Sequence, residues 1–269
     1  MNPRGLASVR VKIGNVVLLI RCELASLIEE LQKRYAGFTT DSASNISVKI
    51  KINQQAYATG LLNVKPTFTE RLVVIDAPGY QGTIDLEGGV SEISLPAERL
   101  AEDTEYFLRL ATALAIFHSG GLMFHAAGVA SGKKVHLFFG HSGSGKTTIA
   151  RNSPGKSVLN DDLVVLLREK GIWKGYSTPF WNPTQVKSIN ASGKIHALYQ
   201  LVQDKQVALE RIAPGIALAE FLANVPVVNA DPGRAEELLE RCQAVVTSVP
   251  VYHLHFLPDS TFWNVLKSG

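Results

Sequence analysis

The stretch Gly140-His-Ser-Gly-Ser-Gly-Lys-Thr147 follows directly after the apolar run of residues 135–139 and matches the pattern G-x-x-x-x-G-K-[ST] in full. This pattern binds phosphate when a strand precedes it and a helix follows it, which is the context here. Its glycines let the backbone turn with the amide groups pointing inward, where they form a nest for phosphate oxygens. The stretch therefore predicts an α/β domain built around a phosphate-binding loop.

The side chains at the end of this loop have distinct expected roles. Lys146 is expected to reach the β and γ phosphates of a nucleoside triphosphate, and Thr147 to supply a hydroxyl to Mg²⁺. His141 contributes at most a side-chain contact with the nucleotide. The predicted nucleotide-binding residues are Gly140, His141, Ser142, Gly143, Ser144, Gly145, Lys146, Thr147 and Thr148.

A pair of carboxylates, Asp161 and Asp162, follows the short apolar strand predicted over residues 157–160. One carboxylate suits a water molecule bound to the metal ion, and the other can accept a proton from an attacking hydroxyl. Both are predicted to be catalytic, as is Lys146, and Asp162 is predicted to bind the metal together with Thr147. Adjacent residues of a strand point to opposite faces, so both can face the site only if the strand ends before them. The alternative is that they cap the following turn.

His125 lies in the predicted strand that precedes the loop strand, within Phe124-His-Ala-Ala-Gly128. If the two carboxylates follow a neighbouring strand, His125 would lie beside Asp161 and influence its charge. A lone histidine in an apolar strand is more often a core residue with a satisfied hydrogen bond. Both interpretations stay open on position alone.

The rest of the pattern divides the chain into residues 1–97 and 98–269. Residues 8–20 predict a β-hairpin around Gly14-Asn15, a helix and several alternating strands follow, and together they indicate a small α+β unit rich in antiparallel strands. From Glu98 the apolar spacing predicts a long amphipathic helix that bridges to the phosphate-loop domain. The edge strands of the first unit would suit an extended peptide.

Composition narrows the classes of partner. Lys and Arg number 27 against 24 Asp and Glu, and 46% of the residues are hydrophobic. This balance gives no reason to expect nucleic acid or a membrane as partner. The two cysteines, Cys22 and Cys242, lack metal-ligand spacing, and the first residues lack the apolar segment of a signal peptide. We therefore expect a cytoplasmic protein with reduced thiols.

The series formed by Phe124-His125-Ala-Ala-Gly128, the loop from Gly140 to Thr148 and Leu159-Asn-Asp161-Asp162 resembles the catalytic domain of the HPr kinase/phosphorylase family in order and spacing. The ending of the chain, residues 250–263, is similar to HPr-kinase-related proteins. The resemblance implies a phosphoenolpyruvate-carboxykinase-like core with a mixed sheet. It also implies Mg·ATP as donor and the serine hydroxyl of a protein or peptide as acceptor.

In such a site the Asp161–Asp162 pair supplies the catalytic base, His125 supports it, and Lys146 and Thr147 hold phosphate and metal. The family also carries a glutamate after the aspartate pair, whereas residues 177–185 contain no carboxylate. This difference favours an acceptor other than HPr. Members of the family are often oligomers, so a homo-oligomer is left open.

Three classes of function compete. The leading one is a kinase whose acceptor is a protein, a peptide or a small molecule. The second is an ATPase or nucleotide-dependent switch without an acceptor; a GTPase is disfavoured because the sequence has no Asn-Lys-x-Asp motif. The third is an assembly protein that retains nucleotide without turnover, which the complete set of Lys146, Thr147 and the two aspartates argues against.

Overall fold

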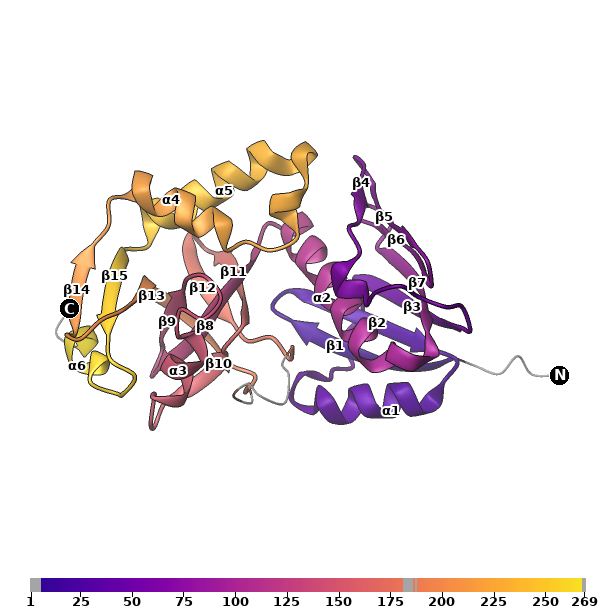
Figure 1. Ribbon diagram of the computed structural model, residues 1–269, viewed down its shortest axis with the longest axis horizontal. Helices are drawn as coiled ribbons and strands as arrows, with labels where there is room; N and C mark the ends of the chain where they lie inside the picture. The colour runs from indigo at the N-terminus through magenta and orange to yellow at the C-terminus, as the bar shows by residue number, and fades with distance from the viewer. Residues whose placement is uncertain (1–5, 181–185, 187, 268–269) are drawn as a thin grey trace. The chain divides into compact units, whose positions relative to one another are not determined.

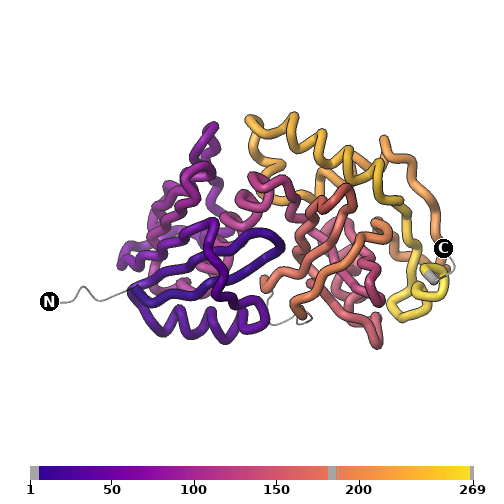
Figure 2. The backbone as a smooth tube through the Cα atoms, turned by 180° about the vertical axis from the view of Figure 1, so that it is seen from behind, coloured from indigo at the N-terminus to yellow at the C-terminus, as the bar shows by residue number. Residues whose placement is uncertain are grey.

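The structure is a computed structural model that describes residues 6–180, 186 and 188–267. The chain forms two compact units, Met1–Ser119 and Gly120–Gly269, and Figures 1 and 2 show them from opposite sides. Helix α2 (Leu100–His118) packs on strands of the first unit. The boundary therefore follows this helix, whereas the sequence pattern places it at residue 97, before the helix. An amphipathic pattern predicts a buried face but does not say which sheet buries it.

The first unit contains a seven-stranded mixed sheet in the order β1-β2-β3-β7-β6-β5-β4. Strands β2, β3 and β7 pair in parallel, and the other neighbours are antiparallel. The predicted hairpin is β1–β2, and Gly14 in its turn has a φ of +59°. The strands are β1 (Ala7–Ile13), β2 (Val16–Cys22), β3 (Ile46–Asn53), β4 (Thr67–Phe68), β5 (Leu72–Ala77), β6 (Tyr80–Asp85) and β7 (Val90–Pro96).

Helix α1 (Ala25–Arg34) and helix α2 cover one face of this sheet. Helix α1 buries Leu27, Ile28 and Leu31, which lie on one side of the helix because their spacing follows its period. The chain also makes short 3₁₀ turns, at Ala36–Phe38, Leu61–Asn63 and Ala97–Arg99 in this unit and at Val228–Ala230 and Pro232–Arg234 in the second.

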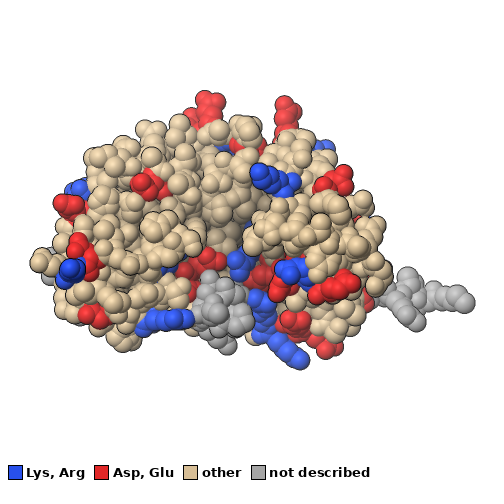
Figure 3. Space-filling view, in the orientation of Figure 1, with Lys and Arg blue, Asp and Glu red and all other residues tan. Residues whose placement is uncertain are grey.

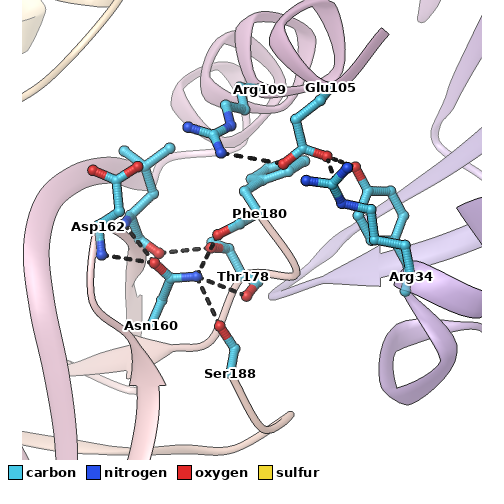
Figure 4. Close-up of polar contacts among 10 residues, drawn as sticks. Arg34, Glu105, Arg109, Asn160, Asp162, Thr178, Phe180 and Ser188 are labelled. Atoms are coloured by element: carbon cyan, nitrogen blue, oxygen red, sulfur yellow. Dashed lines mark hydrogen bonds and ion pairs between the residues drawn. The ribbon is translucent and has the colours of Figure 1, made fainter. Parts of the chain in front are cut away.

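On the face of the molecule shown in Figure 3, Lys and Arg lie among Asp and Glu, in keeping with a formal net charge of +3. In the first unit, buried Glu105 of α2 accepts hydrogen bonds from the hydroxyl of Tyr35 and from Arg109, 3.2 Å away (Figure 4). Since a buried charge is costly without partners, this cluster ties the end of α1 to α2.

The second unit contains an eight-stranded mixed sheet. Strand β13 pairs in parallel with β9 and β15, and the remaining pairs are antiparallel. The pairings β8–β9–β13–β12–β11–β8 close into a ring. The strands are β8 (Leu122–Ser131), β9 (Lys134–Phe139), β10 (Ser157–Asn160), β11 (Leu163–Glu169), β12 (Ile172–Tyr176), β13 (Ser192–Gln203), β14 (Ala208–Arg211) and β15 (Val251–Phe256).

The described residues of this unit form the α-helices α3 (Lys146–Arg151), α4 (Pro214–Ala223), α5 (Ala235–Ser248) and α6 (Phe262–Lys267). Helices α4 and α5 pack on each other, whereas α6 contacts β14 and β15 (Figure 1). Phe138 and Tyr199, whose ring centroids are 5.0 Å apart, and Phe262 and Trp263 of α6 form the aromatic part of the core. This packing fixes β9, which leads into the glycine-rich loop.

The protein is thus a mixed α/β structure with two mixed sheets, in agreement with the α/β class and the mixed sheet predicted from the sequence. Fewer strand pairs of the first unit are antiparallel than expected, because β3 pairs in parallel with both β2 and β7. Over the described part of the chain, the helices are all too short or too polar to traverse a bilayer.

Candidate functional site

The glycine-rich loop begins where β9 ends, at the edge where the carboxyl ends of the parallel strands β9, β13 and β15 meet. Gly140, Gly143 and Gly145 have φ angles of +150°, +78° and +111°, which L-residues with a side chain adopt at a cost. A Cβ at position 145 would lie 2.5 Å from the ring of Phe256. The loop conformation therefore requires glycine at this position.

Lys146 is the first residue of α3 and is 8% exposed. Its Nζ donates hydrogen bonds to the carbonyl oxygens of Gly140, at 2.9 Å, and His141, at 3.1 Å. Burial lowers the pKa of the Lys146 ammonium, and the charge of Asp162 opposes this effect. The ammonium therefore lies inside the loop and needs acidic neighbours, or a ligand with negative charge, to offset its desolvation.

Asp161 and Asp162 lie in a break between two strands. Strand β10 ends at Asn160 and β11 begins at Leu163, and both pair with β8. The two aspartates leave the ladder between these strands, so the alternation of a continuous strand does not apply to them. Both consequently line the same pocket as the loop. The sequence analysis expected this arrangement only if the strand ended before Asp161, as it does here.

The side chain of Asn160 holds this break in place. It is fully buried, and its Oδ1 accepts hydrogen bonds from the backbone N–H groups of Asp162 and Leu163 at 2.7 and 2.9 Å. Its Nδ2 donates to a set of acceptors beyond β12, drawn in Figure 4: the carbonyl oxygens of Thr178 and Phe180 and the hydroxyl of Ser188. The sequence analysis did not single out Asn160, because its partners are distant in the chain.

His125 lies on β8, opposite Leu163 of β11. Its Nε2 is 3.1 Å from Oδ1 of Asp162, and the two side chains are 35% and 22% exposed. Position in the sequence suggested Asp161 as its neighbour; the register places it beside Asp162 instead. Its partial exposure and its place in the lining of the pocket argue against the interpretation of His125 as a core residue with a satisfied hydrogen bond.

Asp161 is 1% exposed and lines the same pocket as the loop. Thr147 donates a side-chain hydrogen bond to its carboxylate, and the N–H of Val186 lies 3.5 Å from Oδ2. Its Oδ1 is buried without a hydrogen-bond partner among the described residues. Burial raises the pKa of Asp161 in spite of these hydrogen bonds, so the carboxylate is held where a cation would stabilise it.

These groups surround one open pocket of ≈ 310 Å³. Gly140, His141 and Ser144 of the predicted loop lie outside its lining, and Ser144 is buried with an Oγ that has no partner among the described residues. The loop is braced from β13 by Gln203, whose Nε2 donates to the carbonyl oxygen of Gly143 at 2.8 Å. The lining residues are His125, Ser142, Gly143, Gly145, Lys146, Thr147, Thr148, Asp161 and Asp162.

The segment that follows β12, residues 177–185, contains no carboxylate and is described only in part. Residues 181–185 and 187 lie outside the described part of the chain, and Ser177, Thr178 and Phe180 are buried. Within the described residues, no group of three or more His, Cys, Asp and Glu side chains is placed to hold a metal ion.

Comparison with known proteins gives little further information. No family model matches the chain, and no curated protein matches it in sequence. Among solved structures, it is similar to the HPr(Ser) kinase/phosphatase from Coxiella burnetii, with 11% sequence identity and a TM-score of 0.32 over 54% of this chain and 86% of that one. The likeness is distant.

Proposed function

We propose that this protein is a Mg·ATP-dependent kinase that transfers the γ-phosphoryl group to a hydroxyl. The observation that carries the proposal is the pocket in which Lys146 and Thr147 meet Asp161, Asp162 and His125. A loop for phosphate, a hydroxyl for the metal and a carboxylate supported by histidine are the parts that phosphoryl transfer needs.

The residues present fit a nucleotide and its metal ion. Gly143 has open space around its Cα, so a phosphate can approach the backbone there. The buried Oδ1 of Asp161 lacks a hydrogen bond among the described residues, and a divalent cation would supply the missing partner. Mg²⁺, when bound, neutralises charge on the phosphate oxygens. Lys146, whose Nζ now contacts loop carbonyls, would turn toward the phosphates.

The hydrogen bonds favour different tasks for the two aspartates. Thr147 donates to Asp161, so these two residues are suited to the metal side of the site. Sequence analysis paired Thr147 with Asp162 for this purpose. Asp162 is instead beside His125 and more exposed, which suits a proton acceptor that an incoming hydroxyl can reach.

In the proposed transfer, the acceptor oxygen forms a bond to the γ-phosphorus. The bond from that phosphorus to the β,γ-bridging oxygen breaks, and ADP leaves with the electron pair. The hydroxyl proton passes to Asp162, and His125 stabilises the carboxylate before the transfer and orients it. Lys146 offsets negative charge on the phosphates. The acceptor that we propose is a serine hydroxyl of a protein or peptide, with a small molecule as the alternative.

The test separates binding from transfer. Asp162→Asn keeps the shape of the side chain and removes the proton acceptor, so it should lower phosphoryl transfer by about 10²–10⁴-fold while ATP still binds. Lys146→Met should weaken ATP binding itself. Titration calorimetry with Mg·ATP and transfer of label from γ-labelled ATP measure the two effects. Full transfer activity in Asp162→Asn would contradict the assignment, and unchanged ATP binding in Lys146→Met would contradict the role of the loop.

A further inference from the structure

Basic side chains gather on one face of strands β1, β2 and β3 in the first unit. On β1, buried Val9, Val11 and Ile13 alternate with exposed Arg10 and Lys12. The strand register continues this exposed side onto the next two strands, because residues directly opposite each other project from the same face. The register pairs Arg10 with Leu19, Ser8 with Arg21, and Arg21 in turn with Lys49. We call this set the basic face; its residues are Arg10, Lys12, Arg21, Lys49 and Lys51.

Little of this charge is neutralised within the chain. Arg10, Lys12, Arg21 and Lys51 are exposed and Lys49 is half-buried. Glu92 on β7 forms ion pairs with both Lys49, at 3.8 Å, and Lys51. With the described part of the chain, Arg10, Lys12 and Arg21 form no ion pair. Among the described residues, Glu92 is therefore the one carboxylate that forms ion pairs with these five cationic side chains.

The helices of this unit pack on the other side of the sheet. Val48, Ile50 and Ile93 point to that side and are buried, as are the apolar residues of β1, and α1 and α2 contact these strands. The basic face carries two buried apolar residues, Val17 and Leu19, directly opposite Lys12 and Arg10. Long basic side chains cover such residues with their methylene stems and keep their charged ends in water.

The composition of this face selects among anionic partners. Sheets that bind RNA or single-stranded DNA stack bases on aromatic side chains, and the residues of this face on β1, β2, β3 and β7 include none. Surfaces that bind anionic membranes combine basic side chains with exposed apolar ones. Only Val90 is both apolar and exposed on these strands. With nucleic acid and membranes disfavoured, the anionic partner that remains is a polypeptide with carboxylate side chains, which the basic side chains attract by charge.

The spacing of the charges indicates the form of that partner. Arg10 and Lys12, and likewise Lys49 and Lys51, are two residues apart on their strands, a separation of about 6.7 Å. An extended peptide places its own alternate side chains at the same separation. We propose that the basic face binds an extended segment of a partner polypeptide with acidic residues at alternate positions.

The polypeptide that binds the basic face would be the acceptor in the proposed phosphoryl transfer. Only its phosphorylation depends on the proposed function. The binding itself needs no nucleotide. It is therefore tested on the full chain without ATP, so that loss of docking and loss of phosphoryl transfer are separate results.

The experiment measures fluorescence anisotropy of a labelled peptide in which Glu alternates with Ser, against a peptide with Gln in place of Glu. We expect the acidic peptide alone to bind, and its affinity to fall as salt screens the charges. The variant Arg10→Gln/Lys12→Gln/Arg21→Gln should bind about tenfold more weakly. Lys33→Gln/Lys65→Gln/Lys133→Gln, which removes the same charge from exposed positions elsewhere, should bind within about twofold of the original chain.

A charge-preserving variant separates charge from folding: Arg10→Lys/Lys12→Arg/Arg21→Lys should keep the affinity. Equal losses in the two Gln variants, or no binding of the acidic peptide, would overturn the proposal. So would tighter binding of an oligothymidylate or of phosphatidylserine vesicles than of the peptide, since either result would assign the face to a different class of partner.

Discussion

At the scale of single residues, Asp161 holds a carboxylate where burial disfavours its charge. The residue is 1% exposed, and burial raises its pKa above the ordinary value of 3.8. The unfolded chain ionises this group more easily than the folded one, so ionisation of Asp161 costs stability once the pH exceeds 3.8. Such a cost is retained in proteins where the charge has a task, here the binding of a cation and phosphate.

This leads to a prediction with opposite signs for stability and activity. Asp161→Asn should raise the melting temperature of the second unit at neutral pH, because the amide carries no charge that burial disfavours, and should abolish turnover. The gain should vanish as the pH falls below 3.8, where both side chains are neutral. Thermal melts over a pH series measure it; a variant that is destabilised at neutral pH would contradict the account.

The glycines of the loop give a second prediction at this scale. Gly145→Ala meets both a φ of +111° and the ring of Phe256, so we expect it to cost about 2 kcal/mol or more and to displace the loop. Gly155→Ala is the control, because Gly155 has a φ of +70° with nothing within 4 Å and should lose only about 1 kcal/mol. Urea unfolding and ATP titration measure both; equal ATP affinity in the two variants would count against the steric argument.

At the scale of elements, Asn160 connects the break between β10 and β11 to the segment after β12. Truncation to Ala removes hydrogen bonds on both sides of the amide at once and should cost about 3 kcal/mol. Ser188→Ala removes a single partner and should cost about 1 kcal/mol. Transfer activity in Asn160→Ala should fall further than ATP binding, because Asp162 loses its position. Similar stability of the two variants in urea unfolding would contradict this role.

Local elements of the fold were predictable where the signal is short-range. Gly14-Asn15 and its flanking alternation predict the hairpin β1–β2, and the apolar run before Gly140 predicts β9. The parallel pairing of β2, β3 and β7 was not predictable, since the residue pattern of a strand does not indicate which strand pairs with it. For the same reason the assignment of α2 to the first unit required the structure.

The residues of the candidate site also fall into those that the sequence predicts and those that only the fold brings together. The loop residues could be named from the sequence because the backbone and one lysine form a contiguous motif. The pairing of His125 with Asp162 instead of Asp161 depends on the register of β8 against β11. Asn160 was missed because its acceptors, at residues 178, 180 and 188, are brought to it only by the fold.

At the scale of the whole molecule, the two units offer separate spectroscopic signals. Trp173 and Trp263 lie in the second unit, and the remaining tryptophan, Trp181, follows Trp173 in the sequence. A ligand that binds the phosphate loop stabilises that unit by mass action, by about 2.7 kcal/mol at a hundredfold excess over its Kd. Mg·ATP should therefore raise the midpoint of unfolding followed by tryptophan fluorescence, and Lys146→Met should abolish the shift. A midpoint that nucleotide leaves unchanged would contradict nucleotide binding at this loop.

The central claim is that a hydroxyl on another molecule receives the γ-phosphoryl group. The most direct measurement incubates the protein with Mg²⁺ and γ-labelled ATP, with and without serine-containing acidic polypeptides, and follows the label by mass spectrometry and chromatography. The account predicts label on a serine hydroxyl of the added polypeptide, with the amount lowered in Asp162→Asn. Label found only in free phosphate would identify an ATPase, and an absence of turnover with every acceptor would contradict the kinase altogether.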